Sequence, residues 1–165
     1  AGAAMTPTAQ LRPGDILCYR PTGLMGWAIA TKTFHNWAHG EMVWVPGVTN
    51  AAARNEGVNL YPMRWDGLGR ALRPPDGFDF DQAVRYFATV RWQRYDWLGL
   101  FAYVRLGRGK GDSQYCSELC TNLMRAGWHA DWPDPFNGED SRIIPPYYFP
   151  CLAGQLRVVW SDGKP

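Results

Sequence analysis

Three short β-forming runs separated by tight turns constrain the fold of this chain more than any other feature. The runs cover residues 38–45, 48–51 and 57–61, and Pro46-Gly47 separates the first two. A connection this short can join only antiparallel neighbours, so the runs predict a β-hairpin extended by a third strand. This part of the chain therefore predicts a largely antiparallel sheet.

Other segments carry helix and strand patterns of the same kind. Further strands are expected at 16–19 and 156–160. Helices are expected at 23–34, at about 79–92 and at 116–126, and Asp79 or Asp81 is the candidate N-cap of the second. Residues 95–104 fit a helix or a buried strand, 65–77 reads as a loop or sheet edge, and 131–150 reads as irregular. Strands first, helices next and a closing strand predict an α+β fold.

The composition is that of one globular domain. The chain has 165 residues, of which 46% are hydrophobic and 19% charged, which is enough to bury a core and too apolar for disorder. We expect a disordered tail at residues 1–10, with Met5 as a candidate start, and a single domain over 11–165. No apolar run of 18 residues is present, so no membrane-spanning helix is predicted. The first residues do not show a signal-peptide pattern, so no signal peptide is predicted.

Charge and cysteine usage argue against two classes of protein. The net charge is +2 and no basic face is apparent, which argues against a nucleic-acid partner. The cysteines form no C-x-x-C pair and are not combined with histidines at a finger-like spacing, so no metal site and no cofactor are predicted. The four cysteines are Cys18, Cys116, Cys120 and Cys151.

Cys116 stands where a glycine-rich loop, residues 105–113, gives way to the predicted helix. The positive end of a helix dipole lowers the pKa of a thiol and favours the nucleophilic thiolate. Free backbone N–H groups at the same place can hold an oxyanion. Cys116 is therefore the candidate nucleophile, against the alternative of a small buried hydrophobe.

His39, near the start of the 38–45 strand, can supply the imidazole that a cysteine nucleophile needs. His129 is a weaker rival base. A third polar group should orient the ring. Asn50 is the first choice because the hairpin can place it beside His39, and Glu41 is the runner-up because it lies two residues along the same strand face. The candidate substrate contacts are Tyr115, Glu41 and Trp97.

Four short motifs resemble those of the NlpC/P60 cysteine peptidases. Residues 11–17, Leu-Arg-Pro-Gly-Asp-Ile-Leu, are similar to the L-x-P-G-D-L start of a strand in that family. Residues 38–43, Ala-His-Gly-Glu-Met-Val, resemble its S-H-V-G-I-Y strand with the catalytic histidine. Residues 48–51 with 56–58 resemble the next strand and its G-V hairpin. Residues 115–119, Tyr-Cys-Ser-Glu-Leu, resemble the C-S-G-L or C-S-E-L helix start with the nucleophile.

The order of these motifs is that of the circularly permuted branch, the YiiX-like and LRAT-like proteins. In most of the family the cysteine helix comes first, whereas here the strands precede it. The resemblance implies a papain-like fold with Cys116 and His39 as the catalytic pair. Two departures stand out: Gly40-Glu41 replaces the usual Val-Gly after the histidine, and Asn50 stands where many permuted members have Glu or His.

The same resemblance implies an activity. It favours a cysteine peptidase or amidase without a cofactor, acting on peptidoglycan stem peptides and coming from a bacterium or phage. One alternative is an LRAT-like acyltransferase or thioesterase acting on lipid or acyl substrates. The other is a catalytically inactive binding module that keeps the fold.

Overall fold

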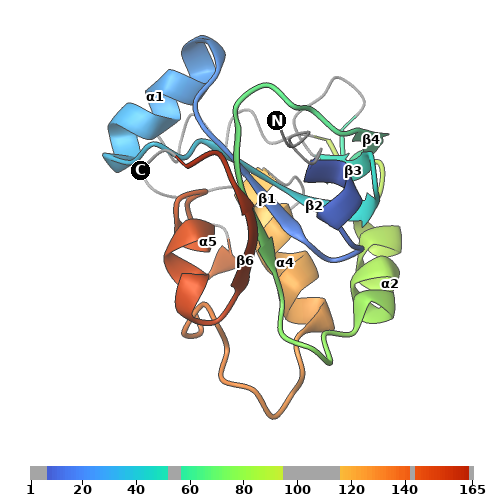
Figure 1. The fold of residues 1–165 in the computed structure, drawn as a ribbon. Coiled ribbons are helices and arrows are strands. Elements are labelled where there is room, and N and C mark those ends of the chain that lie inside the picture. The colour runs from blue at the N-terminus through green and yellow to red at the C-terminus, as the bar shows by residue number, and fades with distance from the viewer. Residues whose placement is uncertain (1–6, 52–56, 95–115, 142–143, 164–165) are drawn as a thin grey trace, which may run out of the picture.

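A six-stranded antiparallel sheet organises the chain in the computed structural model, which describes residues 7–51, 57–94, 116–141 and 144–163 (Figure 1). The strand order is β4-β3-β2-β1-β5-β6. The strands are β1 (Ile16–Tyr19), β2 (His39–Val45), β3 (Val48–Ala51), β4 (Asn59–Pro62), β5 (Leu68–Arg73) and β6 (Arg157–Ser161). With the helices, this sheet confirms the predicted α+β class.

The hairpin predicted from residues 38–61 is confirmed, because β2, β3 and β4 are consecutive antiparallel neighbours. Gly47 adopts φ +89° between β2 and β3, a left-handed conformation that glycine reaches without strain. The register shifts between Val43 and Val45, and Thr49 lies across from Val43. This shift decides which β3 side chains share the sheet face of His39.

The segment 65–77 contains β5, so the prediction of a loop or sheet edge is wrong there. β5 lies between β1 and β6 and is interior to the sheet. A Cβ on Gly69 would stand 2.9 Å from the Trp37 ring, so this glycine marks a close approach of a side chain and not a turn. Ala71 and Leu72 beside it are fully buried. The surrounding glycines and prolines hid the strand pattern.

The predicted helices are confirmed, and the central one is α4, which packs against β2 and α2. Figure 1 shows α4 lying behind the sheet and α1 projecting from it. Asp79 is the N-cap of α2, because its side chain accepts a hydrogen bond from Gln82 N at 3.0 Å. The helical segments are η1 (Pro7–Gln10), α1 (Gly23–Thr33), α2 (Phe80–Val90), α4 (Cys116–Gly127), α5 (Tyr148–Cys151) and η3 (Leu152–Gly154).

Both faces of the sheet are covered by apolar side chains. On one face, Leu119 and Leu123 of α4 belong to the same buried cluster as Met42 of β2. The other face carries a smaller cluster that includes Leu17 and Val43. Alternation along each strand therefore places successive side chains on the face covered by α4 or on the opposite face. Which face a side chain lies on decides which of the candidate residues can meet.

Two predictions about the chain ends and the middle have different outcomes. Residues 7–10, expected in a disordered tail, form η1, and Arg73 Nη2 donates a hydrogen bond to Gln10 O at 2.6 Å. The tail prediction is corrected there, while residues 1–6 and the 95–104 segment lie outside the described residues. None of the described helices is long and apolar enough to cross a bilayer.

Replacing Asp15 with alanine is expected to lower the free energy of unfolding by about 2–3 kcal/mol. The Asp15 side chain is only 1% exposed and accepts hydrogen bonds from Arg12 N, Arg73 Nε and Arg73 Nη2 at 2.7–2.8 Å. Its loss leaves the largely buried Arg73 guanidinium without its carboxylate. Urea unfolding measures the change. The exposed Asp66→Ala is the control, and an equal loss in both variants would contradict the assignment.

Candidate active site

The packing of a helix on a strand brings the two principal candidate residues together. Cys116 is the first residue of α4, and His39 is the first residue of β2. The two side chains are hydrogen-bonded to each other. The nucleophile and base expected from sequence therefore occupy one site, at the end of β2 where His39 pairs with Tyr19 of β1.

The surroundings of Cys116 favour its thiolate. Burial raises the pKa of the thiol, but the charge and hydrogen bond of His39 lower it, as do backbone N–H groups of Gly40 and Ser117, and the lowering prevails. Ser117 is in the first turn of α4, where N–H groups have no helical acceptor. The sulfur thus lies in the dipole field that the sequence predicted for a helix N-terminus.

His39 is held as an imidazolium. Burial by itself would lower the pKa of the ring, but the charge and hydrogen bond of Cys116 and those of Glu41 raise the pKa to about 9. His39 Nε2 lies 2.8 Å from Glu41 Oε1. The thiol pKa falls while the imidazole pKa rises, so each residue favours the charged form of the other, the thiolate and the imidazolium.

Glu41 occupies the position of the third polar residue. Its side chain is 1% exposed, and its Oε2 accepts hydrogen bonds from Thr49 Oγ1 at 2.7 Å and from Tyr19 OH at 3.2 Å. Arg64 Nε lies 3.7 Å from Oε1. Although burial raises the pKa of this carboxyl, the hydrogen bond and charge of His39, the hydrogen bond of Thr49 and the charge of Arg64 lower the pKa overall. Glu41 is therefore an ionised anchor behind the imidazole.

Asn50, the first choice for that position, faces the other side of the sheet. Its Oδ1 accepts a hydrogen bond from Met42 N at 2.9 Å. Its side chain also lies against the buried thiol of Cys120 in α4 and lowers the pKa of that thiol, against the larger effect of burial. The register shift in the hairpin places Thr49 on the His39 side instead. The runner-up, Glu41, thus takes the place that the sequence had given to Asn50.

Two supporting residues, Thr49 and Tyr19, were missed by the sequence reasoning. Both donate hydroxyl hydrogen bonds to Glu41. Tyr19 lies directly across β1–β2 from His39, so an antiparallel pairing of the 16–19 and 38–45 runs with this register would have pointed to it. The role of Thr49 could not be predicted from sequence, because it depends on the register shift between Val43 and Val45.

The remaining candidates lie elsewhere. Tyr115 and Trp97, predicted substrate contacts, are outside the described residues. Glu41 is buried against His39, which argues against its second predicted role as a substrate contact. His129 lies beyond the opposite end of α4 from Cys116, with Nδ1 3.6 Å from Asp131. No group of His, Cys, Asp and Glu in the described ranges could hold a metal ion.

Alkylation is expected to distinguish Cys116 from the other thiols. Burial raises the pKa values of Cys18 and Cys120, whereas Cys151 is exposed. With iodoacetamide at pH 6, Cys116 should react faster than Cys151, because the thiol pKa of Cys116 is lowered. Peptide mass spectrometry across a pH series reads the rates. Faster labelling of Cys151 at every pH would contradict the ion pair.

Two comparisons with known proteins found no match to this chain. No model of a known protein family matches the chain, and no curated protein matches it. The chemistry assigned to the site therefore depends on its geometry and on the motifs in the sequence.

Proposed function

We propose that this protein is a cysteine hydrolase that cleaves an amide bond through Cys116, His39 and Glu41. The supporting observation is the connected set of side chains from the Cys116 thiol through His39 to Glu41, with Glu41 Oε1 2.8 Å from His39 Nε2. A nucleophile, a base and a group that orients the base are the parts that acyl transfer by this route requires.

In the first half of the reaction, the Cys116 thiolate attacks the carbonyl carbon of the substrate. The carbonyl oxygen becomes an oxyanion, which the backbone N–H of Cys116 and a second donor would hold. The intermediate collapses as the C–N bond breaks, and the His39 imidazolium gives its proton to the leaving amine. The products are a free amine and a thioester on Cys116.

In the second half, water replaces the amine. Neutral His39 takes one proton from the water, and the oxygen attacks the thioester carbonyl. The C–S bond breaks, a carboxylic acid leaves, and the thiolate–imidazolium pair is restored. Glu41 remains ionised throughout and fixes the ring of His39 while the imidazole charge alternates.

We assign the fold of the site to the circularly permuted papain-like type. The support is that β1 and β2, which carry Tyr19 and His39, precede the cysteine helix α4 in the chain, and that α4 packs on β2. The NlpC/P60-like motifs at 11–17, 38–43 and 115–119 agree with this order. Peptide stems of peptidoglycan are the substrate class that this resemblance favours.

A muropeptide assay tests the proposal. Purified protein is incubated with disaccharide tetrapeptides and pentapeptides, and products are separated by mass spectrometry. We expect two fragments whose masses sum to the substrate plus one water, and none with Cys116→Ala. Intact muropeptides in both reactions would remove the cell-wall assignment. If Cys116 also reacts no faster than Cys151, an inactive binding module becomes the better description.

A second function, acyl transfer or hydrolysis on lipid substrates, is favoured by one specific observation. Leu24 and Trp27 of α1 are 91% and 58% exposed, and Phe34 at its C-cap is 92% exposed. Exposed large apolar side chains on one element are typical of contact with lipid or a partner. α1 connects β1 to β2, and the site lies where β1 ends at Tyr19 and β2 begins at His39.

The lipid alternative predicts a different covalent intermediate. After incubation with phospholipid vesicles, mass spectrometry should find Cys116 carrying a fatty acyl group, and the Leu24→Ser/Phe34→Asn variant should form less of it. Asparagine tolerates the left-handed conformation of Phe34, at φ +55°. Absence of acyl-Cys116, together with muropeptide cleavage, would reject this alternative.

A further inference from the structure

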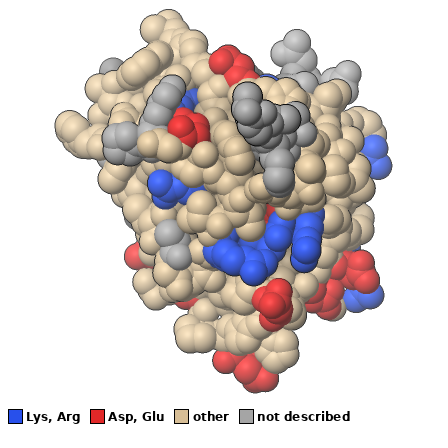
Figure 2. All heavy atoms as spheres, in the orientation of Figure 1, with Lys and Arg blue, Asp and Glu red and all other residues tan. Residues whose placement is uncertain are grey.

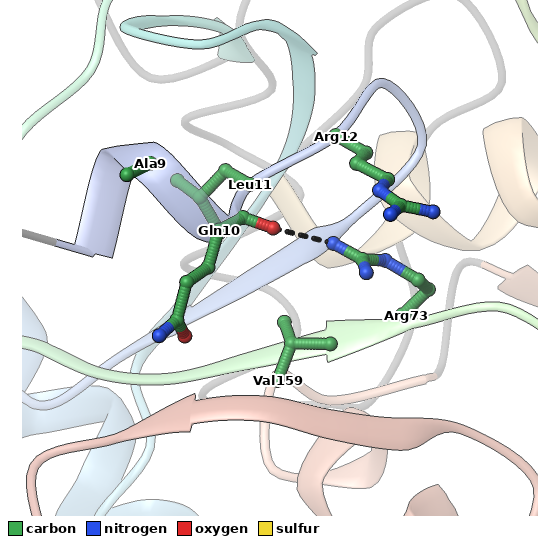
Figure 3. Close-up of a pocket in the computed structure, with 6 residues that line it drawn as sticks. All are labelled: Ala9, Gln10, Leu11, Arg12, Arg73 and Val159. Atoms are coloured by element: carbon green, nitrogen blue, oxygen red, sulfur yellow. Dashed lines mark hydrogen bonds between the residues drawn. The ribbon is translucent and has the colours of Figure 1, made fainter.

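A pocket lined by arginine lies at the far end of β1 from Cys116 and His39 (Figure 3). Its volume is about 440 Å³, within the usual range of small-molecule sites. η1, β5 and β6 surround it. The lining residues are Ala9, Gln10, Leu11, Arg12, Arg73 and Val159. The pocket lies before the first residue of β1, Ile16, and the site lies at its last residue, Tyr19, so about 10 Å of strand separates the two.

Arg73 gives the pocket a rigid cationic wall. Its side chain is 13% exposed, and its Nε and Nη2 donate to the two oxygens of Asp15 at 2.8 and 2.7 Å. Nη2 also donates to Gln10 O, the bond drawn in Figure 3. The guanidinium is therefore fixed before any ligand arrives, which reduces the entropy lost on binding.

Two further arginines, Arg12 and Arg157, add positive charge beside Arg73. Arg157 lies directly across from Arg73 in the β5–β6 register, and like charges in such a pair repel. Within the described part of the chain, neither Arg12 nor Arg157 has an ion-pair partner for its guanidinium. Figure 2 shows a patch of Lys and Arg side chains over this part of the sheet.

The nearby carboxylates do not neutralise the pocket. Asp15 is buried, and its oxygens already accept three hydrogen bonds. Asp76 lines a smaller adjoining pocket of about 170 Å³, which Arg12 and Arg73 also line, and its charge contributes to raising the pKa of Arg73. No described carboxylate lines the 440 Å³ pocket itself. An anion placed there would relieve the repulsion between the arginines.

We propose that this pocket binds a phosphate group, with Arg73 as its fixed wall, Arg12 as a donor from its lining, and Arg157 as a further donor reaching in from its position across from Arg73. Guanidinium groups form paired, charge-assisted hydrogen bonds with phosphate oxygens. Two unpaired guanidiniums match a doubly charged anion better than a single carboxylate. The apolar side chains of Leu11 and Val159 would contact the organic part of a phosphate ester. The proposal is independent of the hydrolase function, because the pocket does not include Cys116.

Phosphate titration at constant ionic strength tests the proposal. Inorganic phosphate, glycerol 3-phosphate and acetate are each added to ¹⁵N-labelled protein, and the Nε–Hε and amide signals of Arg12 and Arg73 are followed. We expect saturable shifts with the phosphates and weaker ones with acetate. Arg12→Gln and Arg157→Gln should each raise the dissociation constant at least about fivefold. Arg85→Gln, an exposed arginine on α2, is the matched control and should bind like the unaltered protein.

The outcomes separate the sources of phosphate and the fate of the proposal. Binding of both soluble phosphates supports a free ligand. Binding only to vesicles that contain phosphatidylglycerol, lost in Arg12→Gln but not in Arg85→Gln, supports a lipid headgroup. Shifts that do not saturate, or equal weakening in Arg12→Gln and Arg85→Gln, overturn the site. Cys116→Ala should bind phosphate normally, so failure of the hydrolase proposal leaves this result unchanged.

Discussion

Substituting Cys116 with serine is expected to lower kcat/KM for the cleaved amide by at least about 10⁴-fold. The thiol pKa of Cys116 is lowered by His39 and by backbone N–H groups of Gly40 and Ser117, which favours the thiolate as the attacking group. A serine hydroxyl in the same place would keep its proton beside an imidazolium. Steady-state kinetics on the substrate found in the muropeptide assay measures the loss.

The control for this experiment is Cys151→Ser. Cys151 is exposed and lies in α5, away from the described contacts of Cys116. We expect its kcat/KM to stay within about twofold of the unaltered protein. Circular dichroism of Cys116→Ser should match as well, because Cys and Ser are close in size. Turnover by Cys116→Ser at a comparable rate would mean that another group performs the attack.

Glu41→Gln is expected to reduce kcat/KM by about 10²-fold and to move the alkaline limb of its pH profile. Activity requires the thiolate and the imidazolium together, so it rises as the thiol ionises and falls as His39 loses its proton. The pKa of His39 is about 9, and Glu41 is one of two groups that raise it. With that carboxylate neutralised, the alkaline limb should shift to lower pH. Serine-protease triads lose up to about 10⁴-fold on such a change, but here the thiolate also stabilises the ring.

Asn50→Ala is the comparison that separates positioning from stability. Asn50 Oδ1 accepts a hydrogen bond from Met42 N inside the sheet, so its loss should lower the free energy of unfolding by about 1–2 kcal/mol. The pH profile should keep its alkaline limb near 9. If Asn50→Ala shifts that limb and Glu41→Gln does not, Asn50 is the residue that acts on His39.

The parts of the fold that depend on local pattern could be predicted from sequence. The hairpin turn at Pro46-Gly47 and the N-cap Asp79 each have a short-range physical cause; the sequence predicts the turn, and it names Asp79 as one of two candidate caps, with Asp81 the other. β5 was missed because Gly69 is required by a distant ring, that of Trp37. A side chain from another segment leaves no trace in the local sequence, and glycine then reads as a turn residue.

The candidate site also contains residues that local pattern predicts and residues that depend on how distant segments pair. Cys116 and His39 could be proposed from a helix start and a strand start, each of which is local. The choice between Asn50 and Glu41 depended on hairpin register, and one extra residue in a strand reverses the faces of all residues beyond it. The alternation rule within one strand was safer, because it placed Glu41 on the face of His39 without any assumption about pairing.

The thickness of the layer between α4 and β2 sets the distance between the reacting groups, because the sulfur belongs to the helix and the ring to the strand. A Cβ on Gly40 would stand 3.6 Å from the Phe149 ring and 3.8 Å from the Cys120 sulfur, so an alanine would fit there while a larger side chain would push the layers apart. The rate of the proposed cleavage by Cys116 should therefore fall as the side chains between α4 and β2 become larger. Enlarging Gly40 or Cys120 would slow the reaction without altering any reacting group, and the same proteins would still unfold cooperatively.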